Sequence, residues 1–147
     1  MDELRAATGS AFGPSAWREV TQATIDAFAT ISGDRQWIHV DVQRARRESP
    51  FGTTIAHGNL TLALIDGFRD ELIGFTGLQL GVNYGYERVR FPQPVPSGSR
   101  LRATVELVSV QPGRERWWRI VQRFSVELEG AAKPACVADS IVLALPS

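Results

Sequence analysis

The sequence predicts a single α+β domain in which one buried helix packs against a long antiparallel sheet. The first observation is the stretch from Gly58 to Leu72, whose apolar residues occupy almost every side of a helix. The second is a series of four later segments in which apolar and polar residues alternate, as in antiparallel strands with one buried face. Because a helix that is apolar on most sides must be covered, we expect the sheet to curl around it.

The length and charge of the chain indicate one ordinary globular domain. Its 147 residues are enough for a hydrophobic core, and the only cysteine, Cys136, allows no internal disulfide. We expect one domain over residues 1–147, with residues 1–14 as a loose N-terminal arm. The 16 basic and 16 acidic side chains balance, which argues against a nucleic-acid partner. No long apolar run or signal peptide is recognisable, so we expect no membrane association and a cytoplasmic location.

Two shorter helices are predicted before the buried one. The first runs from Thr21 to Ser32, where Thr21 is a suitable N-cap and Gly33 is a suitable stop. A short helix or turn is expected from Asp41 to Arg47. Asp41 is expected to cap that helix, although it is also close enough in sequence to orient His39.

Four strands complete the predicted sheet, and the residues of each apolar face share one parity. These faces are Leu78, Leu80, Val82, Tyr84 and Tyr86; Leu101, Ala103, Val105 and Leu107; Trp118, Ile120, Phe124, Val126 and Leu128; and Val137, Ile141, Leu143 and Leu145. We expect each face to be buried. The segment Gln111–Gly113 predicts a hairpin turn, and the proline-rich segment 92–98 is a connection rather than a central strand.

Asp34 and His39 are the candidate catalytic side chains. Because Gly33 is expected to end the first helix, both residues are expected in the following loop, where they can converge on one water molecule. The carboxylate can accept a proton from that water, and the imidazole can hold or relay it. The spacing alone leaves open that Asp34 only caps a turn and that His39 is an ordinary surface residue.

Gly58 is the candidate oxyanion-binding residue because it begins the buried helix. Free N–H groups and the positive end of a helix dipole can hold an oxyanion, and glycine permits close approach. A plain turn glycine remains the alternative. His57 is expected to be structural, with its ring bonded to a backbone carbonyl. A carboxylate, an imidazole and a helix start together favour the addition of water to an acyl group, or its removal.

Two motifs, Ser-Gly-Asp34-(three residues)-Ile-His39-Val-Asp41 and Ile-Ala-His57-Gly58, resemble those of the MaoC-like dehydratases, also called (R)-specific enoyl-CoA hydratases. The segments 82–85 (Val-Asn-Tyr-Gly) and 89–95 (Val-Arg-Phe-Pro-Gln-Pro-Val) resemble the nodulation-protein-N-like branch of that family. The resemblance extends from about residue 15 to residue 145. It implies the hot-dog fold, in which a sheet wraps a long helix, and a homodimer whose sheets join edge to edge.

The resemblance also implies an activity in fatty-acid metabolism. That activity is the reversible syn hydration of trans-2-enoyl-CoA to (R)-3-hydroxyacyl-CoA, with Asp34 and His39 catalytic and Gly58 in the oxyanion hole. It implies no metal and no redox cofactor, and acyl-CoA is the substrate. Two alternatives on the same fold are an acyl-CoA thioesterase and a non-catalytic acyl-binding subunit.

The chain departs from the family pattern at several positions. Gln36-Trp37 stands where many members have Asn-Pro, and Asn59 stands where a methionine is common; we expect both changes to reshape the mouth of the pocket. Asp66 replaces a serine found in some hydratases, and as a buried, unpaired carboxylate it would be costly. Two further arginines, Arg88 and Arg90, are either phosphate contacts or parts of a solvated strand face.

Overall fold

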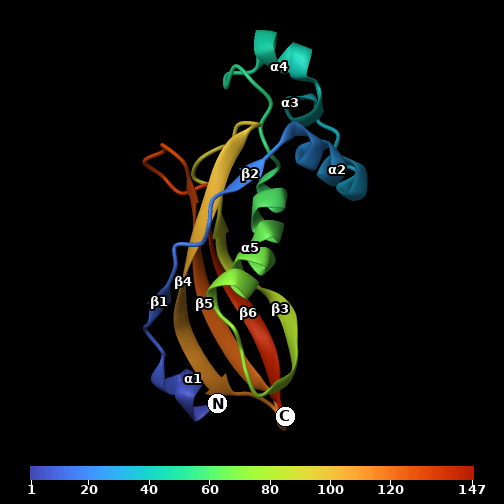
Figure 1. Cartoon of the computed structure of the whole chain (residues 1–147). Coiled ribbons are helices and arrows are strands. Elements are labelled where there is room, and N and C mark those ends of the chain that lie inside the picture. The colour runs from blue at the N-terminus through green and yellow to red at the C-terminus, as the bar shows by residue number, and fades with distance from the viewer.

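A six-stranded antiparallel sheet covers one side of the long helix α5, as Figure 1 shows. The computed structural model describes residues 1–147. Its elements are α1 (Asp2–Ala6), β1 (Ala11–Phe12), β2 (Arg18–Val20), α2 (Gln22–Ser32), α3 (Trp37–Val40), α4 (Val42–Glu48), α5 (Gly58–Leu72), β3 (Leu78–Arg90), β4 (Ser99–Pro112), β5 (Trp118–Leu128) and β6 (Cys136–Pro146). The predicted α+β class and the arrangement of one helix on one sheet are confirmed.

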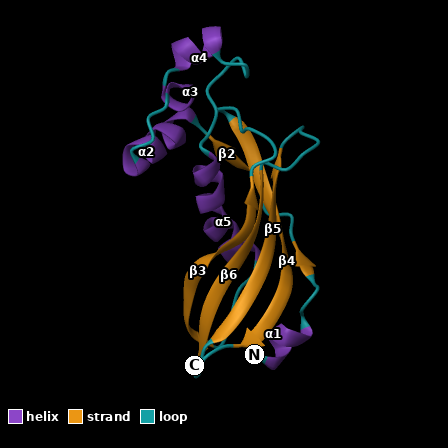
Figure 2. Cartoon of the chain, turned by 180° about the vertical axis from the view of Figure 1, so that it is seen from behind, coloured by secondary structure: helices purple, strands orange, loops and turns teal.

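The strand order is β1-β4-β5-β6-β3, and β2 also pairs with β4. Every pairing is antiparallel. Helices α2, α3 and α4 gather beyond the N-terminal end of α5, whereas the two chain termini lie at the opposite end of the sheet (Figures 1 and 2). The longest helix, α5, has 15 residues, and none of the helices has the length and hydropathy of a membrane span.

The N-terminal residues form a short helix and a short strand. α1 forms one helical turn and a half, and Leu4 packs against a small cluster of buried apolar residues. Ala11 and Phe12 pair with Glu106 and Val105 of β4. The sequence did not predict the short strands β1 and β2, because strands of two or three residues show no periodicity.

Local capping produces the helices as the sequence predicts. The Thr21 hydroxyl accepts a hydrogen bond from the Thr24 N–H at 3.2 Å, and Gly33 ends α2 in the left-handed conformation with φ of 79°. The Asp41 carboxylate accepts a hydrogen bond from the Arg44 N–H at 2.9 Å. Asp41 therefore caps α4, as expected, and does not orient His39.

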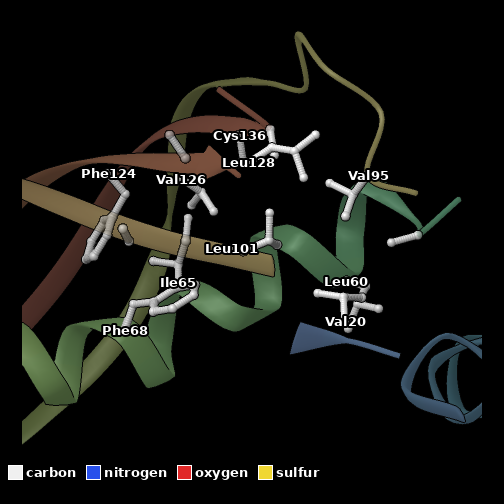
Figure 3. Packing of buried hydrophobic residues seen from close by; sticks show 14 of the residues in the cluster. Val20, Leu60, Ile65, Phe68, Val95, Leu101, Phe124, Val126, Leu128 and Cys136 are labelled. Atoms are coloured by element: carbon white, nitrogen blue, oxygen red, sulfur yellow. The ribbon is translucent and has the colours of Figure 1, made fainter. Parts of the chain in front are cut away.

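The hydrophobic core lies between α5 and the sheet, as Figure 3 shows. Ile65 and Phe68 of α5 are fully buried against strand residues that include Leu101 and Phe124. The expectation of a helix buried on most sides is only partly met, because Ala63 is exposed. Within one chain the sheet covers a single side of α5, and the other side is not wrapped.

The predicted apolar faces of β4 and β5 point toward α5, but that of β6 points away from it. Ile120 pairs with Val142 and Phe124 pairs with Ala138, so the even-numbered residues of β6 share the helix-facing side. β6 carries apolar residues on both faces, with Ala138, Val142 and Ala144 on the side of the helix, so parity alone does not identify the side that faces the helix.

The expectation of a buried apolar face on β3 is wrong. β3 is an edge strand, and its Leu80, Val82 and Tyr84 side chains are exposed, Tyr84 by 68%. A register shift between Asn83 and Gly85 then breaks the alternation and places Tyr86 opposite Ser140, on the side of the helix. Edge position and a bulge both depend on the assembled sheet, so the alternation in the sequence does not reveal them.

Candidate active site

A cavity of about 290 Å³ opens at the N-terminal end of α5, and both His39 and Gly58 line it. Thr61, one turn into α5, and the exposed rings of Phe51 and Phe91 form further parts of its wall. Two of the three residues that the sequence singles out therefore share one cavity.

The third predicted residue, Asp34, lies beside this cavity rather than in its wall. It is in the loop between α2 and α3, and its side chain is exposed. One carboxylate oxygen of Asp34, one ring nitrogen of His39 and one ring nitrogen of His57 all lie within 4.8 Å of one another. The structure thus brings the predicted Asp–His pair together, at a separation that one water molecule can bridge.

His39 is in the single turn of α3, not in a loop as expected. Its N–H donates to the Gln36 carbonyl at 2.9 Å, which begins that turn directly after the loop that carries Asp34. The ring is buried, and its Nδ1 lies 2.7 Å from the Ile55 carbonyl oxygen. Because a carbonyl only accepts, Nδ1 carries the hydrogen and Nε2 is the nitrogen left for proton transfer.

His57 binds a backbone carbonyl, as the sequence analysis expects. Its Nε2–H donates to the Asp34 carbonyl oxygen at 2.9 Å, and its Nδ1 is buried without a hydrogen-bond partner. The ring stacks on that of His39, with centroids 3.8 Å apart and planes inclined by 25°. The Phe28 ring also contacts the His57 ring, and their centroids are 5.0 Å apart.

The stacked rings do not suit a metal ion, although Asp34, His39 and His57 are close enough in distance. Nitrogen lone pairs lie in the ring planes, and Zn–N bonds are about 2.0–2.1 Å long. The lone pairs of two stacked rings, with centroids 3.8 Å apart and planes inclined by only 25°, do not converge on one ion at that bond length. The two rings are therefore poorly oriented to bind one ion together.

Gly58 is the first residue of α5, and its N–H donates no hydrogen bond within the chain. A free N–H at the positive end of a fifteen-residue helix can stabilise an oxyanion. A Cβ atom at this position would lie 2.7 Å from Cδ2 of Phe91. A side chain larger than glycine here would therefore force the Phe91 ring or the start of α5 to move. The sequence did not point to Phe91, because only the assembled fold brings residue 91 to α5.

The departures from the family pattern have structural explanations at two positions. Trp37 does not line the cavity; the Arg44 guanidinium lies over its ring at 4.3 Å. The expectation that Asp66 is a buried, unpaired carboxylate is wrong, because its side chain is 49% exposed and forms an ion pair with Arg69. Asn59 is exposed, and nothing in the structure gives it a role.

Comparisons with known proteins show the family and the fold of this chain. Residues 3–123 match the family described as the MaoC-like domain. The chain is 49% identical over 140 residues to 3-hydroxyacyl-thioester dehydratase Z of Mycobacterium tuberculosis. The alignment covers 95% of this chain and 92% of the relative. It is 38% identical over 150 residues to nodulation protein N of Rhizobium meliloti, covering 98% of this chain and 90% of the relative.

A solved structure of an R-hydratase from Pseudomonas aeruginosa is similar with a TM-score of 0.71 at 24% identity. The similarity covers 95% of this chain and 83% of that chain, and it shows a shared hot-dog fold. The family match and the level of identity to the curated relatives lead to one conclusion: the protein belongs to the MaoC-like dehydratase family.

Proposed function

We propose that the protein is an (R)-specific enoyl-CoA hydratase, which interconverts trans-2-enoyl-CoA and (R)-3-hydroxyacyl-CoA. The observation that carries the proposal is the joint placement of His39 and Gly58 in one cavity, with the Asp34 carboxylate beside the His39 ring. The dehydratase and hydratase names of the relatives support it, because hydration and dehydration are the two directions of one reaction.

In the proposed reaction, Asp34 and His39 hold one water molecule between them. Asp34 takes a proton from the water as its oxygen forms a bond to the β-carbon of the enoyl thioester. The electron pair of the double bond moves toward the thioester carbonyl, and the Gly58 N–H stabilises the resulting enolate oxygen. The proton then returns from the Asp34–His39 pair to the α-carbon. The net change is one water added across the double bond from one face.

The relatives and the site give less support to the two alternatives. A thioesterase would use the same helix N–H and the same base, so it is the dehydratase names of the relatives that favour hydration over hydrolysis. A non-catalytic binding subunit needs neither an exposed carboxylate nor a histidine whose Nδ1 is fixed at 2.7 Å from a carbonyl. Both alternatives remain outcomes of the assay described below.

The proposal includes a homodimer joined through β3. This strand pairs with β6 alone, so its outer edge offers unpaired backbone groups. The apolar side chains Leu80, Val82 and Tyr84 are exposed on the same strand. A second copy that continues the sheet would satisfy the backbone groups and cover part of this apolar surface.

Crotonyl-CoA hydration tests the function directly. We expect the enoyl absorbance to fall, the product to react with an (R)-specific but not an (S)-specific 3-hydroxyacyl-CoA dehydrogenase, and no free thiol to appear. Release of free CoA without hydration would identify a thioesterase. Binding of enoyl-CoA esters of several chain lengths without turnover would identify a binding subunit.

A further inference from the structure

Asp34 has only one hydrogen bond that reaches beyond its immediate neighbours in sequence. Its N–H donates to the Ser32 hydroxyl at 3.2 Å, and its carboxylate accepts from the Gln36 N–H at 3.3 Å. Ser32 is the last residue of α2 and Gln36 lies in the same loop, so both bonds join Asp34 only to residues two positions away. The third bond, from His57 Nε2–H to the Asp34 carbonyl at 2.9 Å, joins the loop to a residue 23 positions later.

His57 is itself held rigidly. It is 3% exposed, it precedes the first residue of α5, and its carbonyl accepts hydrogen bonds from the Leu60 and Thr61 N–H groups. A side chain anchored in this way holds its hydrogen-bond partner at a fixed distance from the N-terminus of α5. The Gly58 N–H is the next backbone group, so the same anchor fixes the distance between the Asp34 loop and the oxyanion-binding helix start.

We propose that His57 is a positioning residue that holds the exposed Asp34 loop at the N-terminus of α5 and at the His39 ring. The inference rests on the proposed hydratase function for its effect on turnover, and on the structure alone for its effect on the loop. It assigns to His57 a task distinct from acid–base catalysis, since its Nε2 is already committed to the Asp34 carbonyl.

The choice of an imidazole supports this assignment. A phenylalanine would pack between Phe28 and His39 as an aromatic ring and would bury no unpaired nitrogen. His57 instead carries a buried, unpartnered Nδ1, which is unfavourable in an interior. The feature that only the imidazole supplies at this position is the N–H directed at Asp34.

His39 depends less on His57 than Asp34 does. The His39 ring has its own hydrogen bond to Ile55, and its carbonyl accepts from the Gln22 side chain at 2.8 Å. Loss of the stacking contact alone therefore leaves His39 with both of these bonds. Loss of the His57 N–H leaves residues 33–36 with hydrogen bonds only to nearby residues of α2 and α3, through the Gly33 N–H, the Arg35 side chain and the Gln36 carbonyl. The effect of His57 on turnover should act through Asp34.

Three variants separate the hydrogen bond from the ring. His57→Phe keeps an aromatic ring and removes the donor. His57→Gln removes the ring but can place an amide N–H near the position of Nε2. His57→Asn, one methylene shorter than glutamine, cannot reach the Asp34 carbonyl and serves as the matched control. It also replaces His57→Phe should that variant fail to fold.

On crotonyl-CoA we expect His57→Phe to lower kcat by about 100-fold, as a displacement of about 1 Å can do, with KM changed by less than about threefold. His57→Gln should recover most of this loss, and His57→Asn should not. In an Asp34→Asn background, His57→Phe should lower kcat by less than about threefold, because the group that it positions is already disabled. An equal loss in both backgrounds, or a His57→Phe enzyme with full kcat, would overturn the proposal.

A second measurement does not depend on turnover. We expect the backbone ¹⁵N order parameters of residues 33–36 to fall in His57→Phe from about 0.85 toward 0.6 while those of α5 stay unchanged. Unchanged order parameters in that loop would contradict the positioning role. If the wild-type protein hydrates no enoyl-CoA, the proposed function fails, and this measurement still decides whether His57 holds the loop.

Discussion

The side chains of Arg69 and Gln122 form a 2.8 Å hydrogen bond across the interface between α5 and β5. The same guanidinium donates to the Ser140 hydroxyl of β6 at 2.7 Å and pairs with Asp66 on its own helix. Gln122 and Ser140 are fully buried, and Arg69 is only 12% exposed. One arginine thus satisfies polar groups of two strands beneath the helix that carries the proposed oxyanion-binding N–H.

Replacement of Arg69 should destabilise the fold. Arg69→Ala leaves the buried side-chain amide oxygen of Gln122 and the Ser140 hydroxyl without this partner. We expect this to lower the free energy of unfolding by about 3 kcal/mol. Asp66→Asn is the control, because its half-exposed ion pair contributes less than about 1 kcal/mol. Urea unfolding measures both. An equal loss of stability in the two variants would show that the buried contacts contribute nothing beyond the ion pair.

A methyl group at residue 58 should impair turnover through its contact with Phe91. Gly58→Ala places a Cβ atom 2.7 Å from the Phe91 ring, so either the ring or the start of α5 must move. We expect a fall in kcat of at least about tenfold. Phe91→Ala provides the control, since it removes the clash. In that background Gly58→Ala should have little further effect, and an undiminished effect would contradict the steric explanation.

A charge on the outer face of β3 should dissociate the proposed dimer. Val82→Lys places a cation among exposed apolar side chains at the sheet edge, where a second copy would bury it unpaired. Ile31→Lys is the matched control, because Ile31 on α2 is also an exposed apolar residue, far from β3 in sequence. Light scattering after size exclusion gives the mass. Dissociation by both variants, or by Ile31→Lys alone, would place the interface elsewhere.

The buried thiol of Cys136 should be unreactive in the folded protein. Burial raises its pKa to about 11, because the thiolate loses its hydration there. The folded state therefore retains the proton where the unfolded state releases it, so this group lowers stability as pH rises from about 9 to 11 and has no effect below that range. Thiol reagents at pH 8 should modify Cys136 only after denaturation. Rapid modification of the native protein would contradict this, and slow modification allows the same reagents to report free CoA.

The sequence predicted those parts of the molecule that depend on local interactions. The Thr21 cap, the Gly33 stop, the Asp41 cap and the start of α5 each involve residues within four positions of one another, and all are confirmed. The partner of Asp66 is also local, at three residues, but a helical arginine has many possible partners in a fold that is not yet assembled.

The remaining features depend on contacts between distant segments. The face of β6 that meets α5, the register shift in β3 and the approach of Phe91 to Gly58 are set only when the sheet assembles. His57 illustrates both cases: its bond to a backbone carbonyl was predicted, but nothing local identifies that carbonyl as the one of Asp34. The candidate site was therefore predictable in its residue types and not in the contacts that hold them.

The most direct test of the proposed function is the rate of crotonyl-CoA hydration by Asp34→Asn beside the wild-type enzyme. Asparagine keeps the shape of the side chain and removes the base, so we expect kcat to fall by about 10²–10⁴-fold with KM little changed. His39→Ala should cause a loss of similar size, because the two groups act on one water. An Asp34→Asn enzyme that hydrates crotonyl-CoA at the wild-type rate would contradict the account.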